Sequence, residues 1–294
     1  MRSHSLRKDN HFSFNNFMDE MLAFENYLYG DNLTIFGNKI QDNEFLVDRI
    51  VLLPSFRPFS VEKVVKISFE YSFDLDFHRM LLERSFECPI LNYRLYQSGF
   101  FNFEEIEPIL MRKESSILFY YYRKEINDFN IVIKNKRNPQ YFEENMIEDE
   151  NKICLLIKFG FIPSSIEYCL KYDDILAFRP LFEPKMHNAR WSPFEWSRKP
   201  VSLDVLSFSG FFGSIQCFKY LISNGYEIND TVRSMVVCSG CFDLIHISID
   251  NKRDGISLMC MASEFCHLFV LKYLVENGGD INLKNKSKIN SILI

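Results

Sequence analysis

The sequence predicts an all-α protein in which short helices pair into stacked hairpins. Three observations lead to this prediction. The 294 residues include 30 Phe and 14 Tyr but only 11 Gly and 10 Pro, and so few turn formers disfavour a many-stranded sandwich. Apolar residues recur at helical spacings of three and four in the first half. A thirteen-residue string recurs in the second half, and internal similarity of this kind indicates repeated structural units.

Residues 1–161 are predicted to form a helical N-terminal region of about six or seven helices. No motif in this region carries recognisable chemistry, so its function is left open. Its apolar stripes are Phe17, Met21, Phe24 and Leu28 (closed by Gly30), then Val61, Val64, Val65 and Phe69, then Ile106, Ile109 and Leu110. The expected turns are Pro54, Pro58, Pro89, Gly99 and Pro139.

The recurring string occurs as Cys217–Asn229 (CFKYLISNGYEIN) and Val270–Asn282 (VLKYLVENGGDIN), which agree at seven of thirteen positions. Extended outward, the second copy follows the ankyrin pattern G-x-T-P-L-H-x-A-A-x-x-G-H, with the residues Gly255, Ser257, Ala262, Ser263 and His267 in place. The same frame fits the first copy and two more. The predicted helix caps are Ser164, Asp204, Thr231 and Ser257.

Each predicted unit is a capped helix, a short turn and a second helix. A cap residue accepts a backbone N–H that the first helical turn leaves unpaired, which stabilises the unit by about 1 kcal/mol. Thr231 follows Asp204 by 27 residues and Ser257 follows Thr231 by 26, against about 33 in a standard repeat. We therefore expect residues 162–294 to form degenerate ankyrin-type repeats with shortened β-hairpin fingers. The 40 residues from Ser164 to Asp204 hold an aromatic insert, Trp191–Trp196, expected to pack across the gap between two units.

The sequence resembles a divergent family of ankyrin-repeat proteins of parabasalid protists, in which a helical region of unknown function precedes and overlaps the repeats. The strings that carry the resemblance are Cys88–Phe101 (CPILNYRLYQSGFF), Pro163–Asp174 (PSSIEYCLKYDD), Trp191–Pro200 (WSPFEWSRKP), Ser207–Gly213 (SFSGFFG) and Val236–His246 (VVCSGCFDLIH). The resemblance implies a fold and no catalytic residues. Asn285–Ile294 begins another unit and then stops, as a truncated member would.

Composition and charge disfavour several classes of function. The net charge of -5 argues against a nucleic-acid partner, which normally requires a basic face. No apolar run approaches the roughly 20 residues that span a bilayer, so no membrane insertion is expected. Met1–Asn16 is polar and lacks the features of a signal peptide. Eight scattered cysteines without an export signal favour reduced thiols, and we expect a cytoplasmic protein.

No metal, cofactor or catalytic residue is predicted. A zinc site could be assembled on paper from Cys238, Cys241, His246, Cys260, Cys266 and His267, but the repeat frame already assigns each of them a packing role. Gly210–Gly213 lacks the Lys and Ser/Thr of a phosphate loop. No nucleophile motif is present, so we expect a protein without enzymatic activity.

The leading functional hypothesis is a protein-interaction module or scaffold that holds an unidentified protein partner. The alternatives are a structural or decaying truncated paralogue with no partner, and an enzyme with a site in the N-terminal helices. In the repeat frame, a groove is expected to be lined by Phe208, Phe211, Phe212, Met235, Met261, Glu264 and Phe265. Because large apolar groove residues rarely lie uncovered, we expect cover from the chain's own N-terminal helices at Phe208 and a partner at Phe265.

Overall fold

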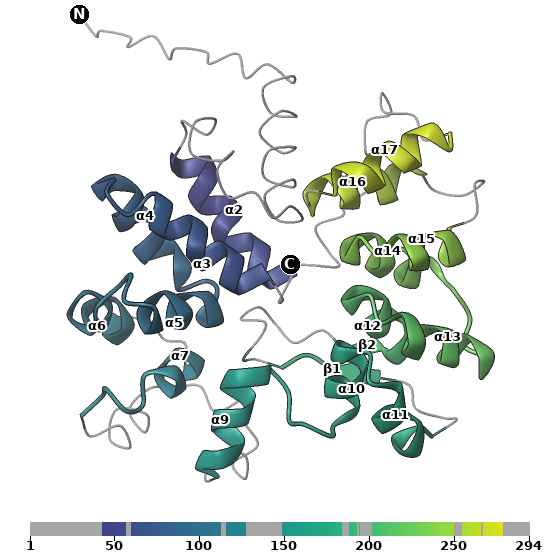
Figure 1. Ribbon diagram of the computed structural model, residues 1–294, viewed down its shortest axis with the longest axis horizontal. Helices are drawn as coiled ribbons and strands as arrows, with labels where there is room; N and C mark the ends of the chain where they lie inside the picture. The colour runs from purple at the N-terminus through teal and green to yellow at the C-terminus, as the bar shows by residue number, and fades with distance from the viewer. Residues whose placement is uncertain are drawn as a thin grey trace, which may run out of the picture. The chain divides into compact units, whose positions relative to one another are not determined.

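The computed structural model describes residues 43–56, 60–112, 116–127, 149–183, 188–192, 194, 202–249, 255–265 and 267–278. Contacts divide the chain into Met1–Gln41 and Asp42–Ile294, and every described residue belongs to the second unit. The all-α prediction is confirmed, because the described residues form fifteen α-helices, one 3-10 turn and one two-stranded sheet (Figure 1). The predicted boundary between residues 161 and 162 stays a prediction.

Seven of these helices precede residue 161. They are α2 (Asn43–Phe56), α3 (Val61–Glu70), α4 (Leu75–Ser85), α5 (Pro89–Gln97), α6 (Phe103–Arg112), α7 (Ser116–Tyr121) and α9 (Glu150–Phe159). Helix α2 packs on α3 and α4, both of these contact α5, and α5 contacts α7.

The predicted apolar stripes are mostly buried. Val61, Val64 and Val65 lie in the core, as do Ile106 and Leu110, while Ile109 is half-buried. Phe69 is an exception, since 41% of it is exposed and its ring rests edge-on against Phe100. Phe69 therefore lies at the solvent-exposed edge of the apolar face of α3.

The predicted turns have mixed outcomes. Pro89 begins α5 and Gly99 adopts φ 79° just after it, so both positions are confirmed as boundaries. Pro54 is buried inside α2, and the turn predicted there is wrong. Without an N–H, Pro54 leaves the carbonyl of Ile50 without its i→i−4 hydrogen bond, and the helix ends two residues later. Pro58, Pro139 and the stripe from Phe17 to Leu28 lie outside the described residues.

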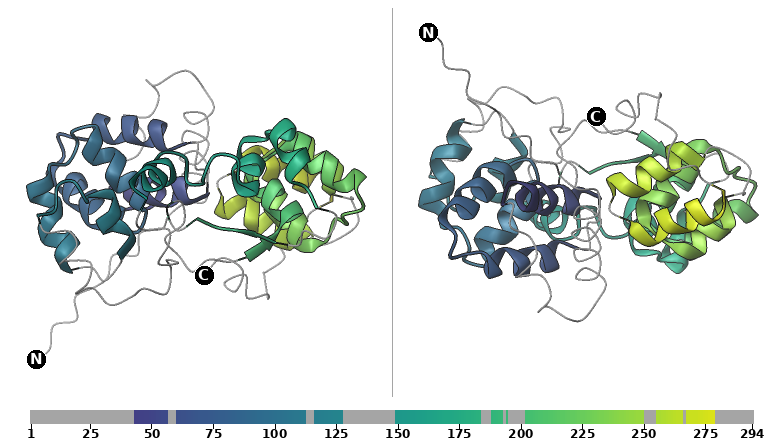
Figure 2. Two further views of the ribbon diagram at one scale, coloured as in Figure 1. Left: turned by 90° about the horizontal axis from the view of Figure 1, so that it is seen from below. Right: turned by 90° about the horizontal axis from the view of Figure 1, so that it is seen from above.

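The remaining helices form four consecutive pairs. The pairs are α10 (Ile166–Tyr172) with α11 (Ile175–Phe178) and a 3-10 turn (Arg179–Leu181), α12 (Val205–Phe212) with α13 (Ile215–Ser223), α14 (Asp230–Ser239) with α15 (Phe242–Ser248), and α16 (Gly255–Glu264) with α17 (Leu268–Glu276). The first helices of successive pairs pack in the order α10, α12, α14, α16. In Figure 2 the green and yellow pairs lie side by side in both views.

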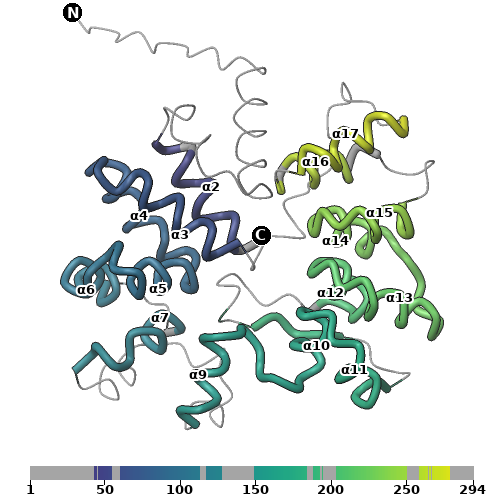
Figure 3. The backbone as a smooth tube through the Cα atoms, viewed as in Figure 1, coloured from purple at the N-terminus to yellow at the C-terminus, as the bar shows by residue number. Residues whose placement is uncertain are grey.

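Tight turns join the two helices of each pair, as the backbone trace of Figure 3 shows. Asp173, Gly213 and Gly240 end the first helices of three pairs in the left-handed conformation, with φ of 54°, 69° and 68°. Within α12, Gly210 lets α14 approach closely, because a Cβ there would lie 3.0 Å from Cγ2 of Val236. This small residue explains the extensive contact between α12 and α14.

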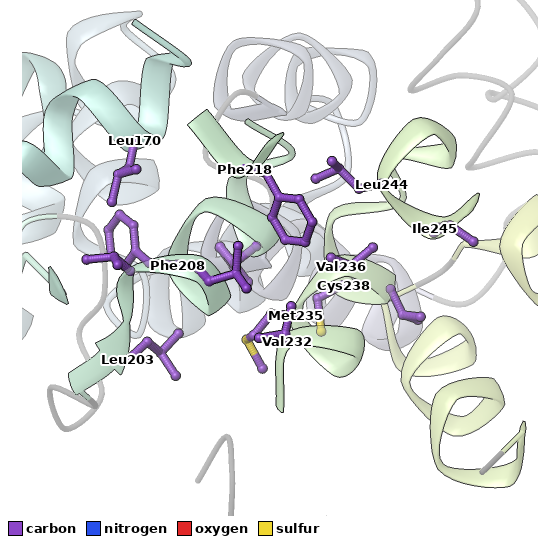
Figure 4. Packing of buried hydrophobic residues seen from close by; sticks show 14 of the residues in the cluster. Leu170, Leu203, Phe208, Phe218, Val232, Met235, Val236, Cys238, Leu244 and Ile245 are labelled. Carbon is purple, nitrogen blue, oxygen red and sulfur yellow. The ribbon is translucent and has the colours of Figure 1, made fainter. Parts of the chain in front are cut away.

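Side chains from the stacked pairs share one core cluster, which includes Leu170 of α10, Phe208 of α12 and Phe218 of α13. Figure 4 shows these three residues with Val236 of α14 and other members from α14 and α15. One pair alone would leave such side chains in water, so the stacking is stabilised mainly by apolar burial.

The only strands in the described part of the chain lie between α11 and α12. Strand β1 (Asn188–Arg190) pairs antiparallel with β2 (Ser202–Asp204), with Ala189 opposite Leu203. Between α13 and α14, residues 224–229 form no strand. The 27 residues from Asp204 to Thr231 predict a short connection in place of a full β-hairpin. The connection between α13 and α14 agrees with this, since it contains a turn and no strand.

One of the four predicted caps is confirmed. Asp204 caps α12, since its carboxylate accepts the N–H of Ser207 at 2.8 Å and the Ser207 hydroxyl at 2.6 Å. Ser165 caps α10 in place of Ser164, whose φ is 73°.

The remaining two cap assignments are wrong. Asn229 caps α14 by accepting the N–H of Val232 at 2.9 Å, which places Thr231 inside the helix. Helix α16 begins at Gly255, so Ser257 is its third residue. At α10 and α14 the cause is the same: a nearby residue with an equally suitable side chain, Ser165 or Asn229, accepts the N–H.

Candidate protein-binding surface

The groove predicted from the sequence is not exposed. Phe208, Phe211, Met235, Met261 and Phe265 are all buried, with at most 3% of any of them accessible. Phe212 is half-buried, and the side chain of Glu264 lies outside the described residues. The five buried residues are therefore corrected from candidate contact residues to core residues.

The cover at the Phe208 end comes from within the chain, as expected, but from different residues. The Trp191 ring lies against the rings of Phe208 at 5.1 Å, Phe211 at 4.8 Å and Phe212 at 5.5 Å between centroids. Phe161, just after α9, contacts Phe208 and Phe212 edge-on. Trp191 of the aromatic insert and Phe161, the last residue of the predicted N-terminal region, together cover α12.

The same insert also contacts the N-terminal helices. The hydroxyl of Tyr121 in α7 donates to the carbonyl of Phe194 at 2.6 Å, and their rings lie 5.6 Å apart. Both residues are buried. Trp191 and Phe194 thus connect α12 to α7. The insert was expected to pack across the gap between two repeat units; Trp191 packs on α12 and Phe194 on α7, so this expectation stays a prediction, and Trp196 lies outside the described residues.

At the other end of the stack, the expectation of a partner at Phe265 is wrong. Phe265 is 1% exposed and its neighbour Met261 is 3% exposed. Both belong to the same apolar cluster as α12 and α14, so a partner could not reach them without displacing core residues.

Polar contacts join successive helix pairs at the turns between the two helices of each pair. The Asp173 carboxylate accepts the N–H groups of Gln216 at 3.1 Å and Cys217 at 2.9 Å at the start of α13. The Ser214 hydroxyl donates to the carbonyl of Leu170 in the preceding pair. A carboxylate at a helix N-terminus is favourable for both hydrogen bonding and the helix dipole.

The cysteine and histidine residues of the conceivable zinc site are spread over several elements: Cys241 and His267 lie at turns, whereas Cys238, His246 and Cys260 lie within α14, α15 and α16. Nε2 of His267 donates to the carbonyl of Cys238 at 2.8 Å, and both residues are buried. Burial raises the pKa of the Cys241 thiol. His246 faces Tyr273, Cys260 is half-buried, and Cys266 lies outside the described residues. In the described part of the chain, no three His, Cys, Asp or Glu side chains are grouped to hold a metal ion.

Exposed apolar side chains gather on the second helices of the last two pairs. We call this the α15–α17 surface, and it comprises Phe242, Ile247 and Phe269 with His246 and Tyr273. Phe242, Ile247 and Phe269 are 38%, 40% and 50% exposed. Three of its members contact one another, since the ring of Tyr273 lies 6.1 Å from that of Phe242 and 5.1 Å from that of His246, both edge-on. Phe269 lies one helical turn before Tyr273 on α17. The Tyr273 hydroxyl is 3.3 Å from Nδ1 of His246.

The repeat pattern does not predict this surface, because it places the groove on the first helix of each unit. A signal is present at Phe269, since the equivalent residue of the α13 unit is the exposed Gln216. A large aromatic residue at such a position of a soluble helix pair suggests contact with another molecule.

Under the alternative of an enzyme site in the N-terminal helices, His78 of α4 is a candidate catalytic residue, because it lies beside a carboxylate. Its Nε2 lies 3.1 Å from Oε1 of Glu105, and its ring stacks on Phe100 at 5.1 Å. The Glu105 carboxylate also accepts the N–H of Asn102 at 2.9 Å. This arrangement caps α6 and joins it to α4, which accounts for both titratable side chains structurally.

Comparison of the sequence with protein-family models, with curated proteins and with solved structures gives no match. Among the helices that the structure describes, none is both long enough and apolar enough to cross a membrane.

Proposed function

We propose that this protein is a non-catalytic interaction module of the ankyrin-repeat type, related to the divergent parabasalid family that its sequence resembles. Its partner is another protein, and the α15–α17 surface is the contact region. This replaces the buried first-helix groove as the proposed site.

A recurring contact between successive helix pairs supports the repeat assignment. In the sequence alignment of the repeats, Ser214, Cys241 and His267 each lie ten residues after Asp204, Thr231 and Ser257, and in the structure each comes directly before the second helix of its pair. Each of the three reaches the preceding pair. Ser214 bonds Leu170, Cys241 lies against Gly213, and His267 lies against Gly240. The contacts differ in chemistry, but the same position reaches the preceding pair three times, which is consistent with stacked repeats.

The observation that supports binding is the composition of the α15–α17 surface. Aromatic residues are the most common anchors of protein interfaces, because they combine large apolar area with few rotatable bonds. Phe242 and Phe269 are held by α-helices and are therefore presented with little loss of conformational freedom on binding. Tyr273 and His246 add polar atoms at the edge of the apolar area.

The test is affinity capture with the intact chain, comparing the wild type with Phe242→Glu and Phe269→Glu. Leu176→Glu on α11 is the matched control, since Leu176 is also highly exposed on a second helix but lies outside the surface. We expect a protein captured by wild type and control to be lost from both Phe variants, with circular dichroism unchanged. If all variants capture the same proteins, the α15–α17 surface is not the contact region. If nothing specific is captured, the paralogue without a partner is favoured.

A further inference from the structure

The turn between α3 and α4 holds the two most exposed large apolar side chains among the described residues. Phe73 is 96% exposed and Leu75 is 83% exposed. Single exposed apolar residues are ordinary on soluble proteins. Two such residues on either side of one helix cap form a compact apolar projection, which we call the Phe73–Leu75 projection.

The backbone beneath the projection is fixed. Asp74 caps α4, since Oδ1 accepts the N–H groups of Asp76 at 2.9 Å and Phe77 at 3.0 Å. Its Oδ2 accepts from Nδ2 of Asn43 in α2 at 2.7 Å. The N–H of Asp74 itself donates to the carbonyl of Tyr71 at 3.1 Å. A partner would therefore meet an ordered turn, and little of the binding free energy would be lost in ordering it.

The charges around the projection are mainly negative. Glu70, Asp74 and Asp76 all lie within four residues of Phe73 and are exposed, with Arg79 paired to Asp76 at 3.4 Å. Hydrogen bonds from Phe77 and Asn43 lower the pKa of Asp74, so its charge persists at neutral pH. The exposed apolar residues therefore lie in an acidic stretch of the chain.

We propose that the Phe73–Leu75 projection is a second docking point, which packs against a helix of a protein partner whose apolar face is edged by lysine or arginine. Complementary charge steers such encounters, and apolar contact supplies most of the affinity. A second copy of this chain fits less well, because a two-fold contact would place carboxylates against carboxylates. An anionic membrane surface is repelled by the same charges. The proposal concerns helices α3 and α4 and is independent of the α15–α17 surface.

The test uses a defined probe, a fluorescent 18-residue amphipathic helix of leucine and lysine, with a leucine and glutamate peptide as the charge control. Binding to the intact chain is measured by anisotropy. We expect Phe73→Ala/Leu75→Ala to weaken binding of the lysine peptide at least about tenfold, which corresponds to about 1.4 kcal/mol. Glu70→Gln/Asp76→Asn should weaken it less and flatten its salt dependence. Leu176→Ala, an apolar truncation elsewhere, should leave it unchanged.

Three outcomes would overturn the proposal. One is equal binding of the lysine peptide by the wild type and the Phe73→Ala/Leu75→Ala variant. Another is equal binding of the lysine and glutamate peptides, which would show that charge plays no part. The third is that the wild type self-associates, or sediments with phosphatidylcholine vesicles, and the Phe73→Ala/Leu75→Ala variant does not. Either result would show that the projection contacts a second copy or a lipid surface instead of a protein partner.

Discussion

The imidazole of His267 lies directly over Gly240 of the preceding helix pair, and its Nε2 donates to the carbonyl of Cys238 at 2.8 Å. Gly240 has φ 68°, and it leaves no space for a side chain, because a Cβ there would overlap the His267 ring. The glycine therefore has two functions: it turns the chain after α14 and it receives the side chain that joins α14 to α17.

We predict that Gly240→Ala destabilises the protein by about 2–5 kcal/mol. Left-handed backbone costs an L-residue roughly 1–2 kcal/mol, and overpacking against His267 adds about 1–3 kcal/mol. Urea unfolding measures the sum.

Gly225→Ala is the matched control, because Gly225 has φ 90° but no atom within 4 Å of the added Cβ. It should cost only the backbone part, about 1–2 kcal/mol. In Gly240→Ala/His267→Ala the steric part should disappear, giving a favourable coupling free energy between the two sites. Additive effects in this double variant would show that the two residues do not interact.

A second prediction concerns the helix caps. Asp204→Ala and Asn229→Ala should each lower the free energy of unfolding by about 1 kcal/mol, because each side chain accepts an otherwise unpaired N–H. Asp204→Asn should retain most of the stability. Thr231→Ala should change it by less than about 0.5 kcal/mol, since Thr231 lies inside α14. A larger loss for Thr231→Ala than for Asn229→Ala would mean that α14 begins later.

The cap assignments show how far the sequence can determine local structure. Gly213 and Gly240 end their helices at φ of 69° and 68°, and few residues other than glycine adopt positive φ readily, so a glycine is a strong local signal. Ser164 and Ser165, or Asn229 and Thr231, are nearly equal as cap residues, and about 1 kcal/mol separates a good cap from none. The spacing of the repeats therefore does not determine which of two neighbouring residues caps a helix, because the two differ little in free energy.

The groove failed as a prediction for a different reason. Helical periodicity identifies Phe208 and Phe211 as facing one direction, but it does not reveal what lies opposite. Trp191 covers them from a segment that precedes α12 and has no helical or strand periodicity. Such a contact depends on the path of an irregular segment, which local sequence preferences do not specify.

A third prediction tests this cover. Trp191→Ala should destabilise the protein by about 3–5 kcal/mol, the usual cost of removing a buried aromatic side chain. In a Trp196→Phe background, the remaining fluorescence of Trp191 should be blue-shifted in the native state and red-shifted in urea. Trp191→Phe should restore part of the stability. A native emission maximum like that of free tryptophan would contradict the contacts of Trp191 with α12.

The last prediction concerns alkaline pH. Burial raises the pKa of the Cys217 thiol well above its ordinary value, and the nearby Asp173 carboxylate raises it further. Burial also raises the pKa of Tyr96 to about 12, with help from Glu125. In the unfolded chain a cysteine ionises near pH 8.5. Above that pH the unfolded state therefore binds fewer protons than the folded state, and stability falls as pH rises. Below about pH 8 these groups contribute no pH dependence.

Between pH 8 and pH 10, Cys217 alone should account for a loss of up to about 2 kcal/mol in the free energy of unfolding. Cys217→Ala lowers stability at every pH through the lost side-chain volume, but it should make the alkaline decrease smaller by that amount. Cys154→Ala is the control, because Cys154 is exposed on α9 and its removal should leave the decrease unchanged. Urea midpoints at pH 7, 8, 9 and 10 give the comparison. An identical alkaline decrease in Cys217→Ala and wild type would show that the Cys217 thiol is not buried between α10 and α13.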